Sequence, residues 1–146
     1  MFMTDNLRSE VRRSLMAMQV RLDWLKRLAA RTDAWWKDDT TCWAAERALH
    51  VCLECATDAA STLIVGLVMR DPGSYEDIFR IMAEESVVPR EWFENFTSAL
   101  KLRDGLIHKY DQITADEVHI GVQDYPGLLQ DFVRFMEIYL QKSPIT

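Results

Sequence analysis

Residues 7–29 read LRSEVRRSLMAMQVRLDWLKRLA, and this stretch decides the fold class. Its apolar residues recur at steps of three and four positions: Leu7, Val11, Leu15, Met18, Leu22, Leu25 and Ala29. This spacing places them on one face of an α-helix, because a helix completes a turn about every 3.6 residues. Residues 7–29 are therefore predicted to form a long amphipathic helix.

Four more segments carry helical signals, and they lie at about residues 41–69, 74–82, 89–107 and 114–139. The second segment ends at Asp71-Pro72-Gly73, a strong helix breaker. Ser74 with Asp77, and Thr114 with Glu117, have the spacing of helix capping boxes. Pro89 suits the first turn of the fourth helix.

No segment alternates convincingly between apolar and polar residues, so no strand is expected. Short connectors between amphipathic helices favour an up-and-down bundle. The chain of 146 residues has the length of one domain and is 49% apolar, enough for a sizeable core. We therefore expect an all-α bundle of about five helices that forms a single domain over residues 1–146.

The charge of the chain is uneven. The formal net charge is −6, yet residues 1–32 hold seven Lys and Arg against three Asp and Glu. The rest of the chain holds ten against twenty. A basic first helix on an acidic body suits contact with a polyanion or an acidic partner. The alternative is a solvated face with pairs inside the chain.

The cysteines and the apolar runs favour a reducing compartment. Three cysteines do not suggest a disulfide framework. Cys52 and Cys55 form a Cys-x-x-Cys in the middle of a helix, where a structural role is expected. The first residues lack the apolar core of a secretory signal. The longest aliphatic run, Leu63–Met69, is far shorter than the roughly 20 residues that span a bilayer. We expect a cytoplasmic protein without a membrane segment.

Other conspicuous side chains have structural interpretations. His50 and His119 have no suggestive neighbours in the sequence, so surface or interface positions are expected. Trp35 and Trp36 are expected to anchor the first connector to the core or to a subunit interface; stacking on RNA bases is the alternative.

The segment RDGLIHKY, residues 103–110, places a fixed cation, a titratable imidazole and a phenol close together. Arg103 stands where the apolar stripe of the fourth helix should continue, and a cation in that place needs a reason. Five positions of an ideal helix turn by about 140°, so Arg103 and His108 would not be adjacent. Either Gly105 loosens the helix there, or the two side chains meet across a dimer axis.

This residue set suits RNA cleavage that needs neither a metal nor a cofactor. A histidine exchanges protons near neutral pH, so His108 can take the proton from a ribose 2′-OH. The planar guanidinium of Arg103 can stabilise charge on the phosphate. Lys101 and Lys109 lie near the motif and are candidates to bind RNA. The alternative is a surface arginine and a helix-terminal histidine near each other by chance.

Arg103-x4-His108-x-Tyr110 is similar to the signature of HepT toxins, a branch of the HEPN superfamily. The resemblance covers about residues 41–140 and includes further segments: Glu46–Leu49, Ser74-Tyr75, Asp77–Phe79, Val88-Pro89 and Tyr110-Asp111. Asp104 follows the arginine where many relatives carry Asn. It fits the wider HEPN pattern as a motif-supporting residue but adds a negative charge near the phosphate path.

The resemblance implies a HEPN-like homodimer in which Arg103 and His108 of both subunits form the active site. It also implies a partner, a nucleotidyltransferase antitoxin of the MntA kind, which silences the toxin by transferring adenylate to Tyr110. Two other functions stay open. One is a non-catalytic helical adaptor that binds a nucleotidyltransferase, an alternative that Asp104 supports. The other is an unrelated helical bundle with a structural role.

Overall fold

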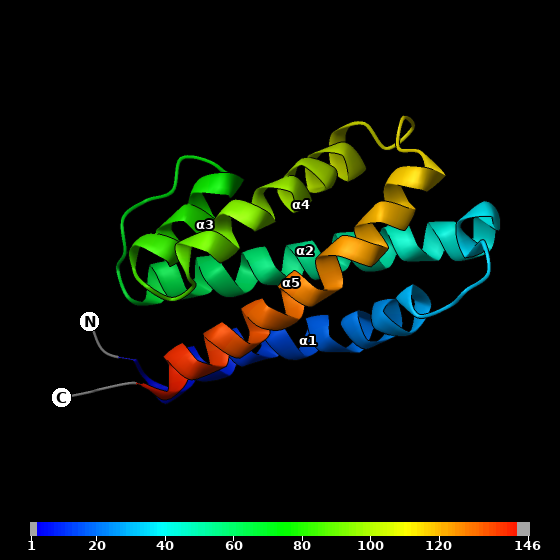
Figure 1. Ribbon diagram of the computed structural model, residues 1–146. Helices are drawn as coiled ribbons and strands as arrows, with labels where there is room; N and C mark the ends of the chain where they lie inside the picture. The colour runs from blue at the N-terminus through cyan, green and yellow to red at the C-terminus, as the bar shows by residue number, and fades with distance from the viewer. Residues whose placement is uncertain (1–2, 143–146) are drawn as a thin grey trace.

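The computed structural model describes residues 3–142 and consists of helices joined by short connectors (Figure 1). The long helices are α1 (Asp5–Ala29), α2 (Asp39–Gly66), α4 (Arg90–His108) and α5 (Ala115–Gln141), and α3 (Tyr75–Glu84) is shorter. A single 3-10 turn, η1 (Trp35–Lys37), follows α1. No strand occurs in the described range. The expected all-α fold of five helices is confirmed.

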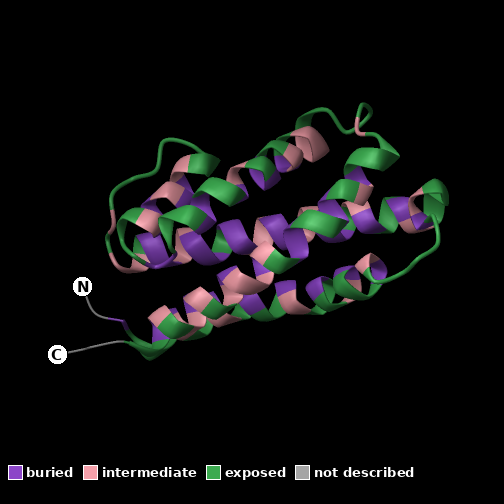
Figure 2. Cartoon of the chain, in the orientation of Figure 1, coloured by how far each residue is buried: buried purple, intermediate pink, exposed green. Residues whose placement is uncertain are grey.

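Helix α2 is the spine of the bundle, because it contacts all four other helices and η1. Its most extensive contact is with α1, and α3 and α4 form a pair on another side (Figure 1). Many of its buried positions are small: Cys42, Ala45, Ala48, Cys52, Ala56, Ala59 and Ala60. Small side chains let several helices approach one backbone closely. Figure 2 shows the buried positions along the length of α2.

The stripe predicted for the first helix is confirmed with one shift. The buried residues of α1 are Leu7, Val11, Leu15, Met18, Leu22, Leu25 and Leu28. Leu28 takes the final core position in place of Ala29, which is half-buried. The helix begins at Asp5 because the side chain of Thr4 accepts a hydrogen bond from the Leu7 N–H.

Helix α2 passes a test of length and apolarity for a membrane span, the only described helix that does so. More than half of its most apolar window is buried inside the bundle. Packing inside the bundle therefore accounts for the larger part of this apolar window.

The connector between α1 and α2 is held by aromatic packing. Trp35 is 1% exposed, and the ring of Trp36 stacks on His119 of α5 with centroids 3.6 Å apart. The expectation that the tryptophans anchor this connector to the core is confirmed. His119 is half-buried in this contact, which the sequence alone does not show because η1 and α5 lie far apart in it.

The first turns of the later helices follow the predicted caps with two adjustments. Thr114 and Glu117 form the full capping box of α5. Ser74 accepts from the Asp77 N–H, but the Asp77 carboxylate accepts from the Gly73 N–H instead of the cap residue. Pro89 is the N-cap of α4, one position before the expected first turn.

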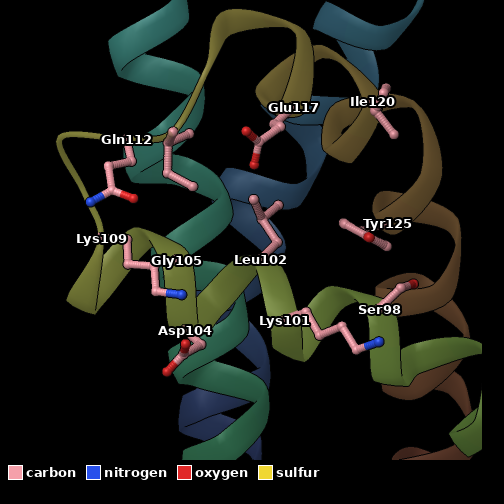
Figure 3. A pocket seen from close by; sticks show the side chains of 11 residues that line it. Ser98, Lys101, Leu102, Asp104, Gly105, Lys109, Gln112, Glu117, Ile120 and Tyr125 are labelled. Carbon is pink, nitrogen blue, oxygen red and sulfur yellow. The ribbon is translucent and has the colours of Figure 1, made fainter.

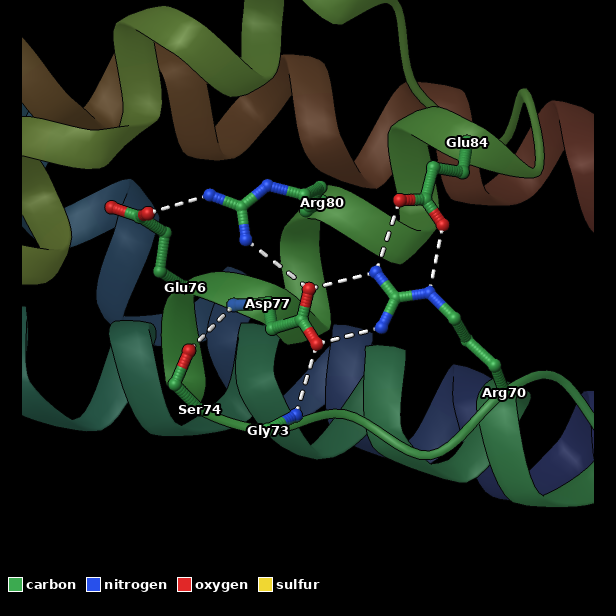
Figure 4. Close-up of polar contacts among 7 residues, drawn as sticks. All are labelled: Arg70, Gly73, Ser74, Glu76, Asp77, Arg80 and Glu84. Atoms are coloured by element: carbon green, nitrogen blue, oxygen red, sulfur yellow. Dashed lines mark hydrogen bonds and ion pairs between the residues drawn. The ribbon is translucent and has the colours of Figure 1, made fainter.

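Arg70 ties the chain that leaves α2 to both ends of α3 (Figure 4). Its guanidinium lies 2.7 Å from Asp77 and 2.9 Å from Glu84. Arg80 adds a 3.2 Å contact to the same Asp77 carboxylate, whose side chain is 14% exposed. These donors stabilise the charged carboxylate, with Arg70 the strongest influence, and hold the pKa of Asp77 well below its usual range.

Asp77→Asn should lower the melting temperature at pH 7 by a few degrees. The carboxylate pKa is depressed in the folded state, so its stabilisation is present above the unfolded pKa of about 3.9 and is lost as pH falls further. The difference in melting temperature between wild type and variant should therefore shrink below about pH 4. Circular dichroism melts from pH 7 to pH 3 measure this, with the exposed Asp124→Asn as control. A difference that stays constant over this range would contradict the role of the charge.

Candidate active site

Helix α4 carries the motif on one unbroken helix that ends at His108. The Lys109 N–H donates to the Gly105 carbonyl at 2.8 Å, so the last turn is regular. The alternative in which Gly105 loosens the helix is therefore wrong. A Cβ at Gly105 would lie 2.8 Å from Cδ1 of Ile113 in the following connector. Glycine serves close packing at this position and does not break the helix.

Arg103 points into the protein and is 5% exposed. Its Nη2 lies 2.8 Å from Oε1 of Glu54 on α2, and its Cζ lies 3.4 Å from the ring centre of Tyr75 on α3. The contact with Glu54 is an ion pair outside hydrogen-bond geometry, and Arg103 Nε has no hydrogen-bond partner among residues 3–142. The guanidinium thus sits between a carboxylate and an aromatic face.

His108 and Tyr110 point in other directions from Arg103. The His108 side chain is 67% exposed, and its Nε2 lies 3.9 Å from Oδ1 of Asp104. Tyr110 follows the helix in a turn and is 73% exposed. Within one protomer, the described contacts therefore do not join Arg103 to His108.

A groove of about 430 Å³ runs between α4 and α5 beside the motif (Figure 3). Lys101, Asp104 and Lys109 line it, so three of the sequence candidates meet there. Its apolar lining is formed by Leu102, Ile113, Ile120 and Tyr125, and Glu117 adds a second carboxylate. The groove combines an apolar surface with two cations and two carboxylates.

Sequence reasoning missed three residues around Arg103. Glu54 lies inside the Cys52-x-x-Cys55 segment, and Tyr75 is the first residue of α3. His50 Nε2 lies 3.5 Å from Glu54 Oε1, and its side chain is 26% exposed, which agrees with the expected surface or interface position. The signal in the sequence was Arg103 itself. A cation on the apolar stripe of a helix needs an anion on a facing helix.

The cysteines flanking Glu54 are poor candidates for redox chemistry. Cys52 is buried, and desolvation raises the pKa of its thiol to about 12. Burial also raises the pKa of Cys55. A reactive cysteine needs the thiolate, which both environments disfavour. No group of three or more His, Cys, Asp or Glu within residues 3–142 gathers as a metal site.

Glu54→Gln should lower the free energy of unfolding by about 1–3 kcal/mol, because it leaves the buried Arg103 charge without its carboxylate. Adding Arg103→Met should restore part of the loss, since the cation that needs the partner is then absent. Urea unfolding of the single and double variants measures both effects. The exposed Glu91→Gln on α4 is the matched control and should change stability by less than about 0.5 kcal/mol. If the changes in unfolding free energy of the two single variants add up to that of the double variant, the two residues are not coupled.

Residues 18–136 match the family described as Ribonuclease HepT-like. The Bacillus subtilis protein named "Putative RNase YutE" is 30% identical over 106 residues, 73% of this chain and 74% of that protein. The structure of YutE, described as a cytosolic protein, superposes with a TM-score of 0.85 at 28% identity and covers 100% of this chain and 99% of its own.

Two structures of toxin–antitoxin complexes share the fold. A tri-AMPylated HEPN toxin of Shewanella oneidensis, in complex with an MNT antitoxin, gives a TM-score of 0.79 at 18% identity and covers 93% of this chain and 99% of its own. An MntA–HepT complex gives 0.78 at 17% identity, with 89% and 98% covered. With residues 18–136 matching the family, this chain belongs to the Ribonuclease HepT-like family.

Proposed function

We propose that this protein is a cytoplasmic endoribonuclease toxin that cleaves RNA without a metal ion. The observation that carries the proposal is the family match together with the environment of Arg103-x4-His108. The arginine is held in one orientation by Glu54 and Tyr75, and the histidine is free to meet substrate. Orientation of one group and access of the other are what phosphoryl transfer requires.

His108 acts as the general base in this mechanism. It takes the proton of the ribose 2′-OH, and the resulting alkoxide attacks the adjacent phosphorus. The bond between phosphorus and the 5′-oxygen breaks, and the leaving oxygen takes a proton from water, which gives a 2′,3′-cyclic phosphate and a 5′-hydroxyl end. Asp104, on the same helix face, is near enough to orient the imidazole once a hydrogen bond forms. Arg103 stabilises the charge that builds up on the phosphate oxygens.

A homodimer would complete this site. Arg103 and His108 diverge on one regular helix, so a second copy is the simplest source of the missing group. A two-fold axis near the end of α4 would bring Arg103 of one protomer towards His108 of its partner. Lys101 and Lys109, on the rim of the groove between α4 and α5, are proposed to contact the RNA backbone.

Tyr110 is proposed to be the site of control. Its phenol is exposed, beyond the end of α4, and therefore accessible to a modifying enzyme. The Shewanella toxin shares this fold and is tri-AMPylated in a complex with its antitoxin. We propose that an MntA-type nucleotidyltransferase adds adenylate to Tyr110. The added phosphate would repel RNA beside the motif.

The second candidate is a non-catalytic adaptor that binds a nucleotidyltransferase. One observation favours it: Arg103 is already paired with Glu54 and covered by Tyr75, so little of its charge faces solvent. Asp104 adds a negative charge at the same helix end. In this case the buried arginine would have a structural role only.

Cleavage of total RNA in excess EDTA separates the two candidates. Wild type should cut RNA, His108→Ala should lose about 10²–10⁴-fold in rate, and Arg103→Lys should lose about 10²–10³-fold because lysine lacks the planar fork. Arg90→Lys, on the opposite end of α4, is the control. Product ends are identified by mass spectrometry, and light scattering reports the dimer. Full inhibition by EDTA, or a fully active His108→Ala, would contradict the mechanism.

Tyr110→Phe tests the control of the toxin. The variant keeps the aromatic ring and removes the oxygen that accepts adenylate, so it should fold and cleave as wild type does. After incubation with the nucleotidyltransferase and ATP, intact-mass spectrometry should show added AMP on wild type and none on the variant. An equal adduct on both proteins would place the modification on another residue.

A further inference from the structure

A second hollow of about 230 Å³ lies on the other flank of the motif, between the first half of α2 and α4. It is lined by Trp43, Glu46, Arg47, His50 and Leu106. We propose that this hollow binds a nucleotide of single-stranded RNA, with a base stacked on Trp43 and a phosphate held by Arg47 and His50. This inference rests on the proposed function and adds a binding site to it.

A chain of contacts connects this hollow to Arg103. Arg47 Nη1 lies 3.4 Å from His50 Nδ1, and His50 Nε2 lies 3.5 Å from Glu54 Oε1. The same Glu54 oxygen lies 2.8 Å from Arg103 Nη2. Helix α2, which supplies Glu54 to the motif arginine, therefore also supplies most of the lining of the hollow. Its α4 wall, Leu106, stands in the sequence between Arg103 and His108.

Trp43 has the exposure expected of a stacking platform. It is 65% exposed, whereas Trp35 and Trp92 are buried and Trp24 and Trp36 pack partly against the core. Single exposed apolar side chains are common on protein surfaces. An exposed indole beside an arginine and a histidine, at the mouth of a hollow, is the combination that binds single-stranded nucleic acid.

The charges of the hollow suit one phosphate. Arg47 is exposed and has no Asp or Glu within ion-pair distance in the part of the chain that the structure describes. The Glu54 carboxylate contacts both Arg103 and His50, and the contact with Arg103 is the shorter one. His50 therefore does not neutralise that carboxylate alone. Glu46 is the opposing charge, and burial raises the pKa of its carboxyl. The phosphate would lie on the Arg47 side, which leaves Glu46 facing a base or a ribose hydroxyl.

Fluorescence anisotropy with a labelled oligouridylate of about ten nucleotides tests the site in the full chain. The protein carries His108→Ala so that the RNA stays intact. Trp43→Leu should weaken binding by about 5- to 150-fold, the range that loss of one stacked base implies. Trp43→Phe, which keeps an aromatic face, should retain most of the affinity.

The salt dependence tests the phosphate contact. Arg47→Gln should reduce the slope of log affinity against log salt by about 0.7, the value for one phosphate on single-stranded RNA. Arg90→Gln is the control, because Arg90 is also an exposed arginine but lies at the far end of α4, away from the hollow. It should leave the slope and the affinity unchanged.

The outcomes separate the binding site from the proposed nuclease function. Wild-type affinity and slope in both Trp43→Leu and Arg47→Gln would exclude it, and so would failure of the parent protein to bind the RNA. If Trp43→Leu changes the mass measured by light scattering but not the RNA affinity per protomer, Trp43 belongs to an interface between copies of the chain. That result would also exclude the RNA site. Binding that depends on Trp43 and Arg47, in a wild type that cuts no RNA, would reject the proposed nuclease function and retain the site.

Discussion

A buried guanidinium sets the strongest constraint on this structure. Arg103 is almost fully withdrawn from solvent, and moving an unpaired cation into the interior costs several kcal/mol. Glu54 supplies the opposite charge, and the ring of Tyr75 covers the flat face of the cation. These two side chains come from α2 and α3, so three helices must adopt one register before the charge is satisfied.

The position of Tyr75 depends on how α3 begins. Ser74 caps the helix directly before Tyr75, and Asp77 holds the preceding backbone through Gly73. Arg70 joins that same aspartate to Glu84 at the end of α3. A surface network with no part in the chemistry thus fixes the residue that covers Arg103. The small buried residues of α2 contribute as well, because they let the neighbouring helices pack closely against that helix.

The helices were predictable because each follows from local rules that the sequence displays. Periodic apolar residues, caps and the Asp71-Pro72-Gly73 breaker located all five to within a few residues. The surroundings of Arg103 were not predictable in the same way, since they arise from tertiary contacts between helices. Glu54 occupied a motif that suggested cysteine chemistry, and His50 had no notable neighbour in the sequence. Gly105 suggested a break, but only the returning connector shows that it serves close packing.

The same burial that makes Arg103 costly also determines what it could do. In a dry site, the interaction between a guanidinium and a phosphate is far stronger than in water, and a fixed donor needs no reorganisation when charge develops. Glu54 works against this, because it neutralises the cation that the phosphate must meet. A phosphate therefore has to share or displace that carboxylate. His50 lies on the other side of Glu54, beside the hollow at Trp43, and contacts the same carboxylate oxygen as Arg103. A substrate phosphate near His50 and Arg47 would compete with Glu54 for His50 and repel the Glu54 carboxylate. In the function we propose, the strength of the pairing between Glu54 and Arg103 thus separates an arginine that only holds helices together from one that acts on RNA.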